Sequence, residues 1–263
     1  MRGGCAARRR NLAPAEASPV ATSARLPGLS VFLPSHNEEA NVERVVRGYL
    51  AELPKVAADY EVIVVNDGSR DRTGEIAARL AAADPHVKAV NHSVNRGYGG
   101  AVVSGIRAAA MPYVMLSDGD GQFDPADIAK LAAFMPEYDV VAGYRAHRAD
   151  HLIRRLNGKA WTILVRAVLG VTIGDIDCGF KMFKREFLDG MELRAHGAMI
   201  STELMARLMG RGARIKEVEV RHLPRVAGEQ SGANLWVVAR AFRELFVLYR
   251  ELHAERRRAG QSP

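Results

Sequence analysis

The stretch YVMLSDGDGQFDP, residues 113–125, decides how this chain of 263 residues is interpreted. Its first half is apolar and is typical of a buried strand, and its second half becomes polar and acidic where that strand ends. Asp118, Asp120 and Gln122 alternate along the segment, so on an extended backbone two carboxylates and an amide oxygen face the same side. A glycine follows both Asp118 and Asp120, which permits a sharp turn and close approach of a large ligand. Oxygen ligands without sulfur or histidine suit Mg²⁺ or Mn²⁺, so we expect a metal site that receives a diphosphate.

Other phosphate or metal motifs are absent from the sequence. An EF-hand loop would require a glutamate at its twelfth position, and counting from Asp118 that position is Ala129. No G-x-x-x-x-G-K-[ST] loop occurs, and no G-x-G-x-x-G follows the first expected strand, so P-loop and dinucleotide-binding interpretations lose their main support. A purely structural turn is the remaining alternative for the acidic segment, because an isolated Asp-x-Asp is common by chance.

Strands and helices alternate on both sides of this segment. Short β-branched runs predict strands at 29–33, 61–65, 87–90, 113–117 and 139–143. Apolar residues at helical spacing predict helices at 38–53, 71–83, 98–110 and 124–135, with Asn37 as a candidate cap of the first. This order, with short connections, predicts an α/β fold with a mostly parallel central sheet and helices on both faces.

Two further polar clusters follow expected strands, namely PSHNEEAN (34–41) and NDGSRDRT (66–73). In parallel α/β sheets, ligands bind at the carboxyl ends of the strands. We therefore expect both clusters to meet the acidic segment at one edge of the sheet. A single aspartate at a strand end could equally cap the next helix, which stays an alternative for Asp71 and Asp124.

Composition and charge limit the class of protein. The chain has 37 Lys and Arg against 30 Asp and Glu, a net charge of +7, and 48% hydrophobic residues, which is ordinary for a globular protein. Five arginines and one glutamate fall in residues 1–28, which show no apolar periodicity, so we expect a disordered basic tail there. The chain has only two cysteines, Cys5 in the expected tail and the distant Cys178, so we expect no disulfide framework and a reducing, cytoplasmic location. No basic groove with interleaved aromatics is visible, so no nucleic-acid partner is expected.

The carboxy-terminal segment predicts an amphipathic helix at 233–256, followed by a basic tail at 257–263. Its apolar stripe is flanked by arginines, a pattern that can lie on an anionic membrane. The alternative is that the helix packs on the body or on a second subunit. No apolar run approaches the roughly 18 residues that a membrane crossing needs, so we expect at most peripheral attachment at the cytoplasmic face.

The ordered set of motifs resembles family 2 glycosyltransferases of the GT-A fold. The motifs are PSHNEEAN, NDGSRDRT, NRGYGGA (95–101), DGDGQFDP, GYR (143–145) and DCGFKMF (177–183). Within that family they are most similar to the dolichol-phosphate mannose synthase group, which moves a sugar from a nucleotide donor to a polyprenyl phosphate. The resemblance implies a GT-A glycosyltransferase domain at 29–232.

The resemblance also implies roles for individual residues. It implies nucleotide-sugar contacts at Pro34, Asn37, Glu38, Asp67, Gly97, Gly100 and Asp118. It implies metal ligation by Asp118, Asp120 and Gln122, with Asp120 the direct ligand. It implies contacts with the acceptor phosphate at Arg145, Arg154, Arg155 and Ser231, and a catalytic set of Asp120, Arg145, Arg155 and Arg225. Gly232 departs from the family pattern, which reads lysine there.

The expected reaction is a metal-dependent, inverting transfer of a hexose from a donor of the GDP-mannose or UDP-glucose type to a polyprenyl or dolichyl phosphate. A phosphate monoester, with a second pKa near 6, is already an anion at neutral pH and needs no general base. One alternative is transfer to a hydroxyl acceptor, with Glu203 or Asp177 as the base. Another is a non-catalytic protein that binds a membrane surface. The sequence leaves the oligomeric state open.

Overall fold

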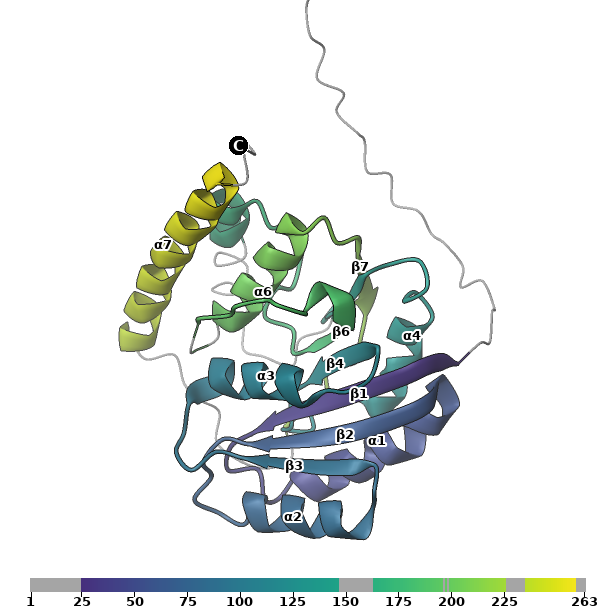
Figure 1. Ribbon diagram of the computed structural model, residues 1–263. Helices are drawn as coiled ribbons and strands as arrows, with labels where there is room; N and C mark the ends of the chain where they lie inside the picture. Colours follow the sequence, from purple (N-terminus) through teal and green to yellow (C-terminus); the bar gives the residue numbers. More distant parts are fainter. Residues whose placement is uncertain (1–24, 147–162, 196, 198, 226–234, 259–263) are drawn as a thin grey trace, which may run out of the picture.

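A seven-stranded sheet forms the centre of the computed structural model, which describes residues 25–146, 163–195, 197, 199–225 and 235–258. The strands are β1 (Leu26–Ser35), β2 (Ala57–Asn66), β3 (Val87–Asn91), β4 (Tyr113–Ser117), β5 (Val140–Tyr144), β6 (Phe180–Lys184) and β7 (Ile215–Glu219). Their order is β3-β2-β1-β4-β6-β5-β7, and only β6 runs antiparallel to its neighbours β4 and β5 among these strands (Figure 1). The expected α/β fold with a mostly parallel sheet is confirmed.

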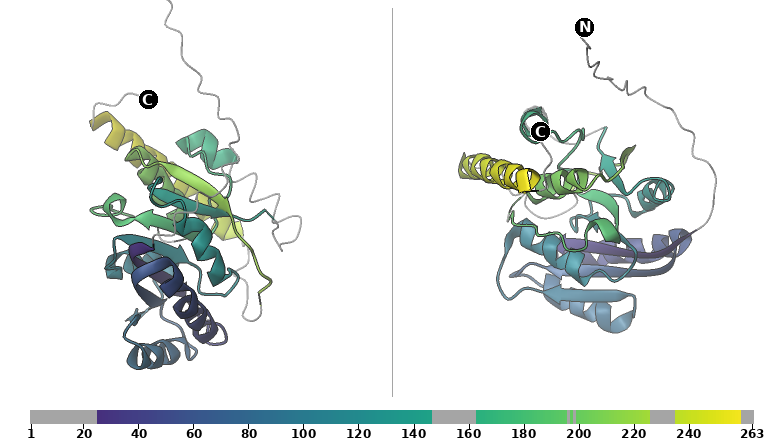
Figure 2. Two further views of the ribbon diagram at one scale, coloured as in Figure 1. Left: turned by 90° about the vertical axis from the view of Figure 1, so that its right-hand side faces the viewer. Right: turned by 45° about the horizontal axis from the view of Figure 1, so that its top comes forward.

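Helices cover both faces of the sheet. Successive strand residues point to opposite faces, and the residues on each face are apolar. In β1, Val31 and Leu33 join one buried cluster and Phe32 joins the other. The first cluster is closed by α1 (Val42–Val56), α2 (Thr73–Ala83) and α4 (Ile128–Ala132). The second is closed by α3 (Gly97–Ala108), α6 (Met199–Gly210), α7 (Leu235–Arg258) and the helical residues 163–169. In Figure 2, α7 lies beside α6, far from α1 and α2.

Several boundaries differ from those expected. β1 begins at Leu26, so the last residues of the expected tail belong to the sheet. The first helix begins at Val42 rather than 38, and Asn37 lies outside it with a φ of 55°, so the expectation that Asn37 caps this helix was wrong. The helix expected at 124–135 is a 3₁₀ turn, η1 (Pro125–Asp127), followed by α4.

Strands β6 and β7 were not predicted from the sequence. Their sequences, FKMFK and IKEVE, carry charged residues that mask the apolar pattern of a strand. Yet Lys181, in the middle of β6, is fully buried. β6 is also antiparallel, which a repeated strand and helix order does not foretell.

The end of the chain forms α7, two residues later at each end than the helix expected at 233–256. Predictions for residues 1–24, 147–162, 226–234 and 259–263, including most of the two expected tails, lie outside the described residues. No helix in the described part of the chain has the length and apolar character that crossing a membrane requires.

Candidate active site

The acidic segment leaves the carboxyl end of β4 and is fixed by backbone bonds to two neighbouring segments. The N–H of Asp118 donates to the carbonyl of Gly179 at 3.1 Å, and the N–H of Gly119 donates to the carbonyl of Pro34 at 3.2 Å. The Oδ1 of Asp120 accepts the N–H of Gln122 at 3.0 Å, which closes the turn. The carboxyl ends of β1 and β4 therefore lie together, as predicted, and are joined by the bond from Gly119 to Pro34.

The side chain of Asp118 is half-buried and held by neighbouring groups. Its Oδ1 accepts the hydroxyl of Tyr98 at 2.8 Å, and its side chain packs directly on Gly179. Burial, and next the charge of Asp120, raise the pKa of Asp118 to about 7, against the lowering effects of Tyr98, Lys181 and Arg145. A cation bound beside Asp118 would offset both the burial and the charge of Asp120.

The donor set fits a hard divalent ion that shares its ligands with a substrate. Asp118, Asp120 and the amide oxygen of Gln122 offer oxygen only, as Mg²⁺ and Mn²⁺ prefer. No cluster of three or more His, Cys, Asp or Glu residues in the described chain could hold a metal by itself. Such a site needs further oxygens, which a diphosphate can supply. The Nε2 of Gln122 donates to the carbonyl of Leu223 at 3.3 Å, which orients this amide.

Arg225, from the segment after β7, contacts Asp120 and Glu38. Its Nη1 lies 3.5 Å from Oδ2 of Asp120, and its Nη2 donates to Oε1 of Glu38. The guanidinium is 17% exposed and joins the two carboxylates. Glu38, for which the resemblance implied a nucleotide contact, binds Arg225 through one carboxylate oxygen. Asn41 donates to its other oxygen at 2.7 Å. Burial raises the pKa of Glu38 despite these bonds.

The segment that carries Arg225 is attached to the acidic loop at several points. The N–H of Leu223 donates to the carbonyl of Gln122 at 2.7 Å, and Phe123 forms a β-bridge with His222. Arg221 binds Asp127 through its backbone N–H at 2.7 Å and through its Nη2 at 2.8 Å. Arg225 is thus held in place by its own segment.

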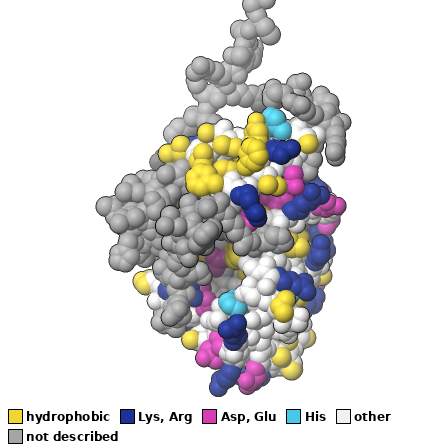
Figure 3. All heavy atoms as spheres, turned by 90° about the vertical axis from the view of Figure 1, so that its left-hand side faces the viewer, with side chains coloured by type: hydrophobic (Ala, Val, Ile, Leu, Met, Phe, Trp, Pro, Cys, Tyr) yellow, Lys and Arg dark blue, Asp and Glu magenta, His cyan; other side chains and the backbone are white. Residues whose placement is uncertain are grey.

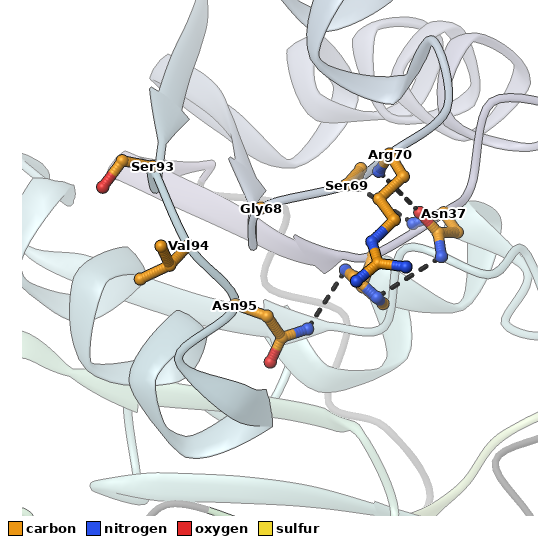
Figure 4. Close-up of a pocket in the computed structure, with 8 residues that line it drawn as sticks. Asn37, Gly68, Ser69, Arg70, Ser93, Val94 and Asn95 are labelled. Atoms are coloured by element: carbon orange, nitrogen blue, oxygen red, sulfur yellow. Dashed lines mark hydrogen bonds between the residues drawn. The ribbon is translucent and has the colours of Figure 1, made fainter.

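A cleft of about 610 Å³ opens between the loops that follow β1, β2 and β3 (Figure 4). Its lining residues are His36, Asn37, Gly68, Ser69, Arg70, Ser93, Val94 and Asn95. Asn37 links two of these loops, because its N–H donates to Ser69 at 3.0 Å and its Oδ1 accepts the N–H of Arg70 at 3.0 Å. Figure 4 shows Gly68 between the Asn37 side and the Val94 side of the cleft. The cleft has the size and polarity of a site for a small polar ligand.

Asp67 precedes Gly68 of this lining in the chain and is only 3% exposed. Its Oδ1 is 2.7 Å from Nδ1 of His92 and accepts the N–H of Arg96 at 2.8 Å. The Nε2 of His92 lies 2.8 Å from the hydroxyl of Ser104, which fixes the ring. The sequence motifs identified Asp67 but not His92. The position of His92 just after β3 was the feature that could have indicated a role in the site.

Gly97 and Gly100 open α3 at the same edge of the sheet. The N–H of Gly97 donates to Oδ1 of Asn95 at 2.9 Å, which connects the helix start to the cleft. The α-carbon of Gly100 faces the Arg96 side chain, where an added Cβ would come within 2.5 Å. Tyr98, between them, reaches Asp118 and was missed in the sequence.

Arg145 follows β5 and is paired with Asp175. Its Nε and Nη2 donate to the two carboxylate oxygens at 2.7 and 2.8 Å, and this bidentate pair is 11% and 13% exposed. Burial lowers the pKa of Arg145, but the bonds and charge of Asp175 outweigh it and raise the pKa. The predicted phosphate contacts Arg154, Arg155 and Ser231 lie outside the described residues.

Lys181 is a buried cation that sequence reasoning did not assign. Its Nζ donates to the carbonyls of Ile176 and Cys178, the former at 3.0 Å. Burial lowers the pKa of Lys181, while nearby acidic groups that include Asp118 oppose that change. A lysine inside the apolar run of β6 was the available signal.

Glu203, a candidate base, has a structural environment. It is 1% exposed, it binds Arg207 at 2.9 Å, and it accepts the backbone N–H groups of Arg194 and Ala195 at 2.9 and 2.8 Å. Because its oxygens bind Arg207 and the backbone of the segment before α6, the structure gives no support to Glu203 as a base. Asp177 is half-buried beside the turn that Lys181 binds.

Comparison with known proteins adds three findings. The model of glycosyl transferase family 2 matches residues 30–191. Undecaprenyl-phosphate 4-deoxy-4-formamido-L-arabinose transferases from Pectobacterium atrosepticum and Shewanella sediminis are 32% and 31% identical, each over 76% of this chain. The chain spans 61% and 60% of the length of these two relatives.

Solved structures share the fold at low sequence identity. Glucosyl-3-phosphoglycerate synthase from Mycobacterium tuberculosis, in complex with Mn²⁺, UDP and phosphoglyceric acid, superimposes with a TM-score of 0.64 at 20% identity, over 90% of this chain and 80% of that one. The same synthase with Mn²⁺, UDP and glucosyl-3-phosphoglycerate gives a TM-score of 0.63 at 21% identity, over 90% and 81%. These are GT-A glycosyltransferases, so the fold expected from the motifs is confirmed.

Proposed function

The chain belongs to glycosyl transferase family 2, and from that premise we propose that it transfers a sugar from a nucleoside diphosphate to a polyprenyl phosphate, with inversion and with a divalent metal. The observation that carries this proposal is the arrangement of Asp118, Asp120 and Arg225, an acidic pair with an arginine positioned beside it from another segment. A metal and fixed cations both stabilise the negative charge that develops on a leaving diphosphate.

The cleft beside the acidic pair is the proposed site of the nucleoside. It is bounded by Asn37 and Gly68 and lies at the same edge of the sheet as Asp120. A nucleoside there would direct its diphosphate towards the acidic loop. Gly97 and Gly100, at the start of α3, flank this path and offer the positive end of a helix.

Uracil is the base that we favour. Oδ1 of Asp67 already accepts from His92 and from the N–H of Arg96, so Oδ2 is the oxygen that remains for a base among the described contacts. Uracil presents one ring N–H, whereas guanine presents two adjacent donors that pair best with both oxygens of a carboxylate. The M. tuberculosis synthase structures, which hold UDP, agree with this preference. A transfer assay has to identify the sugar itself, since the curated relatives are named for a modified arabinose.

The metal would be held by Asp120 and Asp118, with the oriented amide of Gln122 beside them. When bound, it would offset the negative charge that develops on the leaving diphosphate. Arg225 would hold the diphosphate, and Glu38 fixes the position of Arg225. The family resemblance assigns Arg145, Arg154, Arg155 and Ser231 to the acceptor phosphate; of these, Arg145 is oriented by Asp175.

An acceptor that is already anionic agrees with the engagement of Glu203. A hydroxyl acceptor would require a free carboxylate to take its proton, and Glu203 is bound to Arg207 and two backbone N–H groups. The polyprenyl phosphate acceptor is also the one that the curated relatives are named for, as undecaprenyl-phosphate transferases.

The test is a panel of radiolabelled UDP- and GDP-sugars with polyprenyl phosphate and Mn²⁺ or Mg²⁺, with product extracted into organic solvent. We expect label in the lipid fraction with a UDP-sugar, loss of that label in chelator, and loss in Asp120→Asn. The exposed Asp59 of β2 supplies the control variant Asp59→Asn, which should transfer normally. Unchanged transfer by Asp120→Asn, or transfer in chelator, would contradict the proposal.

A further inference from the structure

The inner face of α7 is an ordinary core-packing face. Leu245, Leu248 and Leu252 are 4%, 5% and 8% exposed and join the buried cluster that α6 also closes. Glu251, on the side that faces the body, binds Arg194 at 3.1 Å and Arg207 at 3.7 Å. The helix is therefore attached to the body by leucines and by ion pairs, and its opposite face needs a separate explanation.

That opposite face is apolar and basic at once. Phe242, Phe246 and Val247 are 51%, 60% and 49% exposed. Arg243 and Arg250 are also exposed, and at 100° per residue they fall between Phe246 and Val247 around the helix. Neither arginine has a carboxylate partner in the described part of the chain, and the guanidinium of Arg250 lies 6.0 Å from the ring centroid of Phe246. Figure 3 faces this side and shows hydrophobic side chains gathered beside Lys and Arg.

We propose that this outer face of α7 docks on an anionic lipid bilayer. Exposed phenylalanines insert into the boundary between headgroups and acyl chains, and unpaired arginines bind anionic headgroups. The acidic residue Glu251 points to the body, so the charge offered outward is positive, which complements an anionic surface. The inference rests on the proposed function for its purpose, because a polyprenyl phosphate acceptor resides in a membrane.

The first test is co-sedimentation with vesicles that contain no acceptor, made of phosphatidylcholine alone or with phosphatidylglycerol. The wild type should bind the anionic vesicles, and the double variants Phe242→Ser with Phe246→Ser and Arg243→Glu with Arg250→Glu should each reduce the bound fraction about fivefold or more. Lys55→Glu with Arg79→Glu, on α1 and α2, changes net charge by the same amount and should bind as the wild type does. Absence of vesicle binding, or an equal loss in this control, overturns the proposal.

A second test separates the docking surface from the reaction. Transfer to a short, water-soluble prenyl phosphate should be unchanged in the α7 variants, while transfer to vesicle-borne polyprenyl phosphate should fall with their vesicle binding. Wild-type vesicle binding without transfer to either acceptor would contradict the proposed function and leave the docking surface intact. Equal transfer by the wild type and the α7 variants to the vesicle-borne acceptor would show that docking through α7 does not serve the reaction. It would overturn the inference that docking brings the site to its lipid acceptor.

An independent observation concerns Arg225, which contacts one carboxylate oxygen of the proposed metal ligand Asp120. Asp120 uses Oδ1 for the N–H of Gln122 and Oδ2 for Arg225. A divalent ion on Asp120 would therefore meet a guanidinium 3.5 Å from the same carboxylate, and the two cations repel one another. The attachment of Leu223 to Gln122 keeps Arg225 close even when its contact with Asp120 breaks.

We infer that Arg225 competes with free divalent metal for Asp120, and that a nucleoside diphosphate removes this competition. The diphosphate offers Arg225 a stronger anionic partner than Asp120, so metal and donor enter together. Glu38 keeps hold of the guanidinium while it turns. This inference rests on the metal site of the proposed function.

The test is titration of Mn²⁺ by electron paramagnetic resonance, which needs no turnover. Without nucleotide, Arg225→Ala should bind Mn²⁺ about tenfold more tightly than the wild type, and Arg225→Lys should stay near the wild type because the charge is kept. With UDP present, Arg225→Ala should bind Mn²⁺ more weakly than the wild type. Arg44→Ala removes a cation that packs on Gly121 of the same loop and bonds only Asn41 among the described residues, so it is the matched control.

The outcomes are distinct. If Arg225→Ala binds free Mn²⁺ as the wild type does, or more weakly, the inferred competition is overturned. Arg225 would then only stabilise the position of the acidic loop. A tenfold gain in Arg44→Ala as well would show that any nearby charge acts, which also overturns it. If the wild type binds no Mn²⁺ even with UDP, the proposed metal-dependent function itself fails.

Discussion

Gly179 lies directly against the carboxylate of Asp118. A Cβ on Gly179 would come within 2.0 Å of Oδ2 and 2.3 Å of Cγ of Asp118. The carbonyl of Gly179 also accepts the N–H of Asp118 at 3.1 Å. Gly179, just before β6, therefore helps to set the orientation of Asp118, just after β4.

Gly179→Ala should displace Asp118 and weaken the proposed metal site. Because both the loop backbone and β6 are fixed, we expect overpacking to reduce the free energy of unfolding by about 1–3 kcal/mol, with Mn²⁺ affinity reduced as well. Thermal unfolding and Mn²⁺ titration measure the two effects. Gly210→Ala is the control, since a Cβ there meets nothing within 4 Å. Wild-type Mn²⁺ affinity in a folded Gly179→Ala protein would contradict this role.

Gly68→Ala should displace the wall of the cleft at Val94 and Asn95 as well as strain the backbone. Gly68 has a φ of 64°, and its added Cβ would lie 2.5 Å from the backbone nitrogen of Asn95. Gly212→Ala isolates the strain, because Gly212 has a φ of 77° with nothing within 4 Å. We expect a stability loss of about 1 kcal/mol for Gly212→Ala with normal donor affinity, and a larger loss for Gly68→Ala with weaker UDP binding. Calorimetry with UDP distinguishes them, and equal UDP affinity in both variants would contradict the assignment of the cleft.

Asp127 should make the attachment of the Arg225 segment depend on pH. Burial disfavours its ionised form, but bonds from Arg221 and Lys130 outweigh burial and hold its pKa below the ordinary 3.8. A carboxyl whose pKa is lower in the folded state stabilises that state above its unfolded pKa, and this contribution is lost as pH falls through the folded pKa. Asp127→Asn should thus cost about 1–3 kcal/mol at pH 7, and the difference from the wild type should shrink below about pH 4. Urea unfolding between pH 7 and pH 3 checks this, and a difference that grows on acidification would contradict it.

Lys181→Met should loosen the turn before β6. The substitution removes the donor to the carbonyls of Ile176 and Cys178 while it keeps most of the side-chain volume. We expect a loss of about 1–3 kcal/mol, because buried carbonyls are left without a partner. Lys184→Met, in the same strand but bonded to Asp139, is the comparison, and it should leave sugar transfer unchanged while Lys181→Met reduces it. Normal transfer by a folded Lys181→Met protein would show that the turn does not support the site.

The sequence was sufficient to predict where the strands end and which acidic residues follow them. Apolar periodicity located β1, β2 and β4, and parallel strands place their carboxyl ends together, so Asp67 and Asp118 could be assigned to one edge of the sheet. The pairing of Glu38 with Arg225 could not be predicted, because it joins residues 187 positions apart. The family resemblance implied a nucleotide contact for Glu38, and the structure adds its bond to Arg225.

The antiparallel strand was hidden for a different reason. Lys181 is charged in sequence but buried in the structure, where two carbonyls bind its ammonium group. Tertiary contacts of this kind override a local pattern. Arg145 illustrates the same limit, since only the fold shows that Asp175 binds both of its donors.

The bonds between Gln122 and Leu223 join residues 101 positions apart, so the acidic loop is synthesised well before its partner segment. A ribosome that adds roughly 5–20 residues per second exposes the acidic loop for about 5–20 s before the segment with Arg225 emerges. Throughout that interval Asp120 and Glu38 lack the cation that joins them. The amino-terminal half of the sheet can therefore fold during translation, while the reaction centre is completed only when most of the chain has left the ribosome.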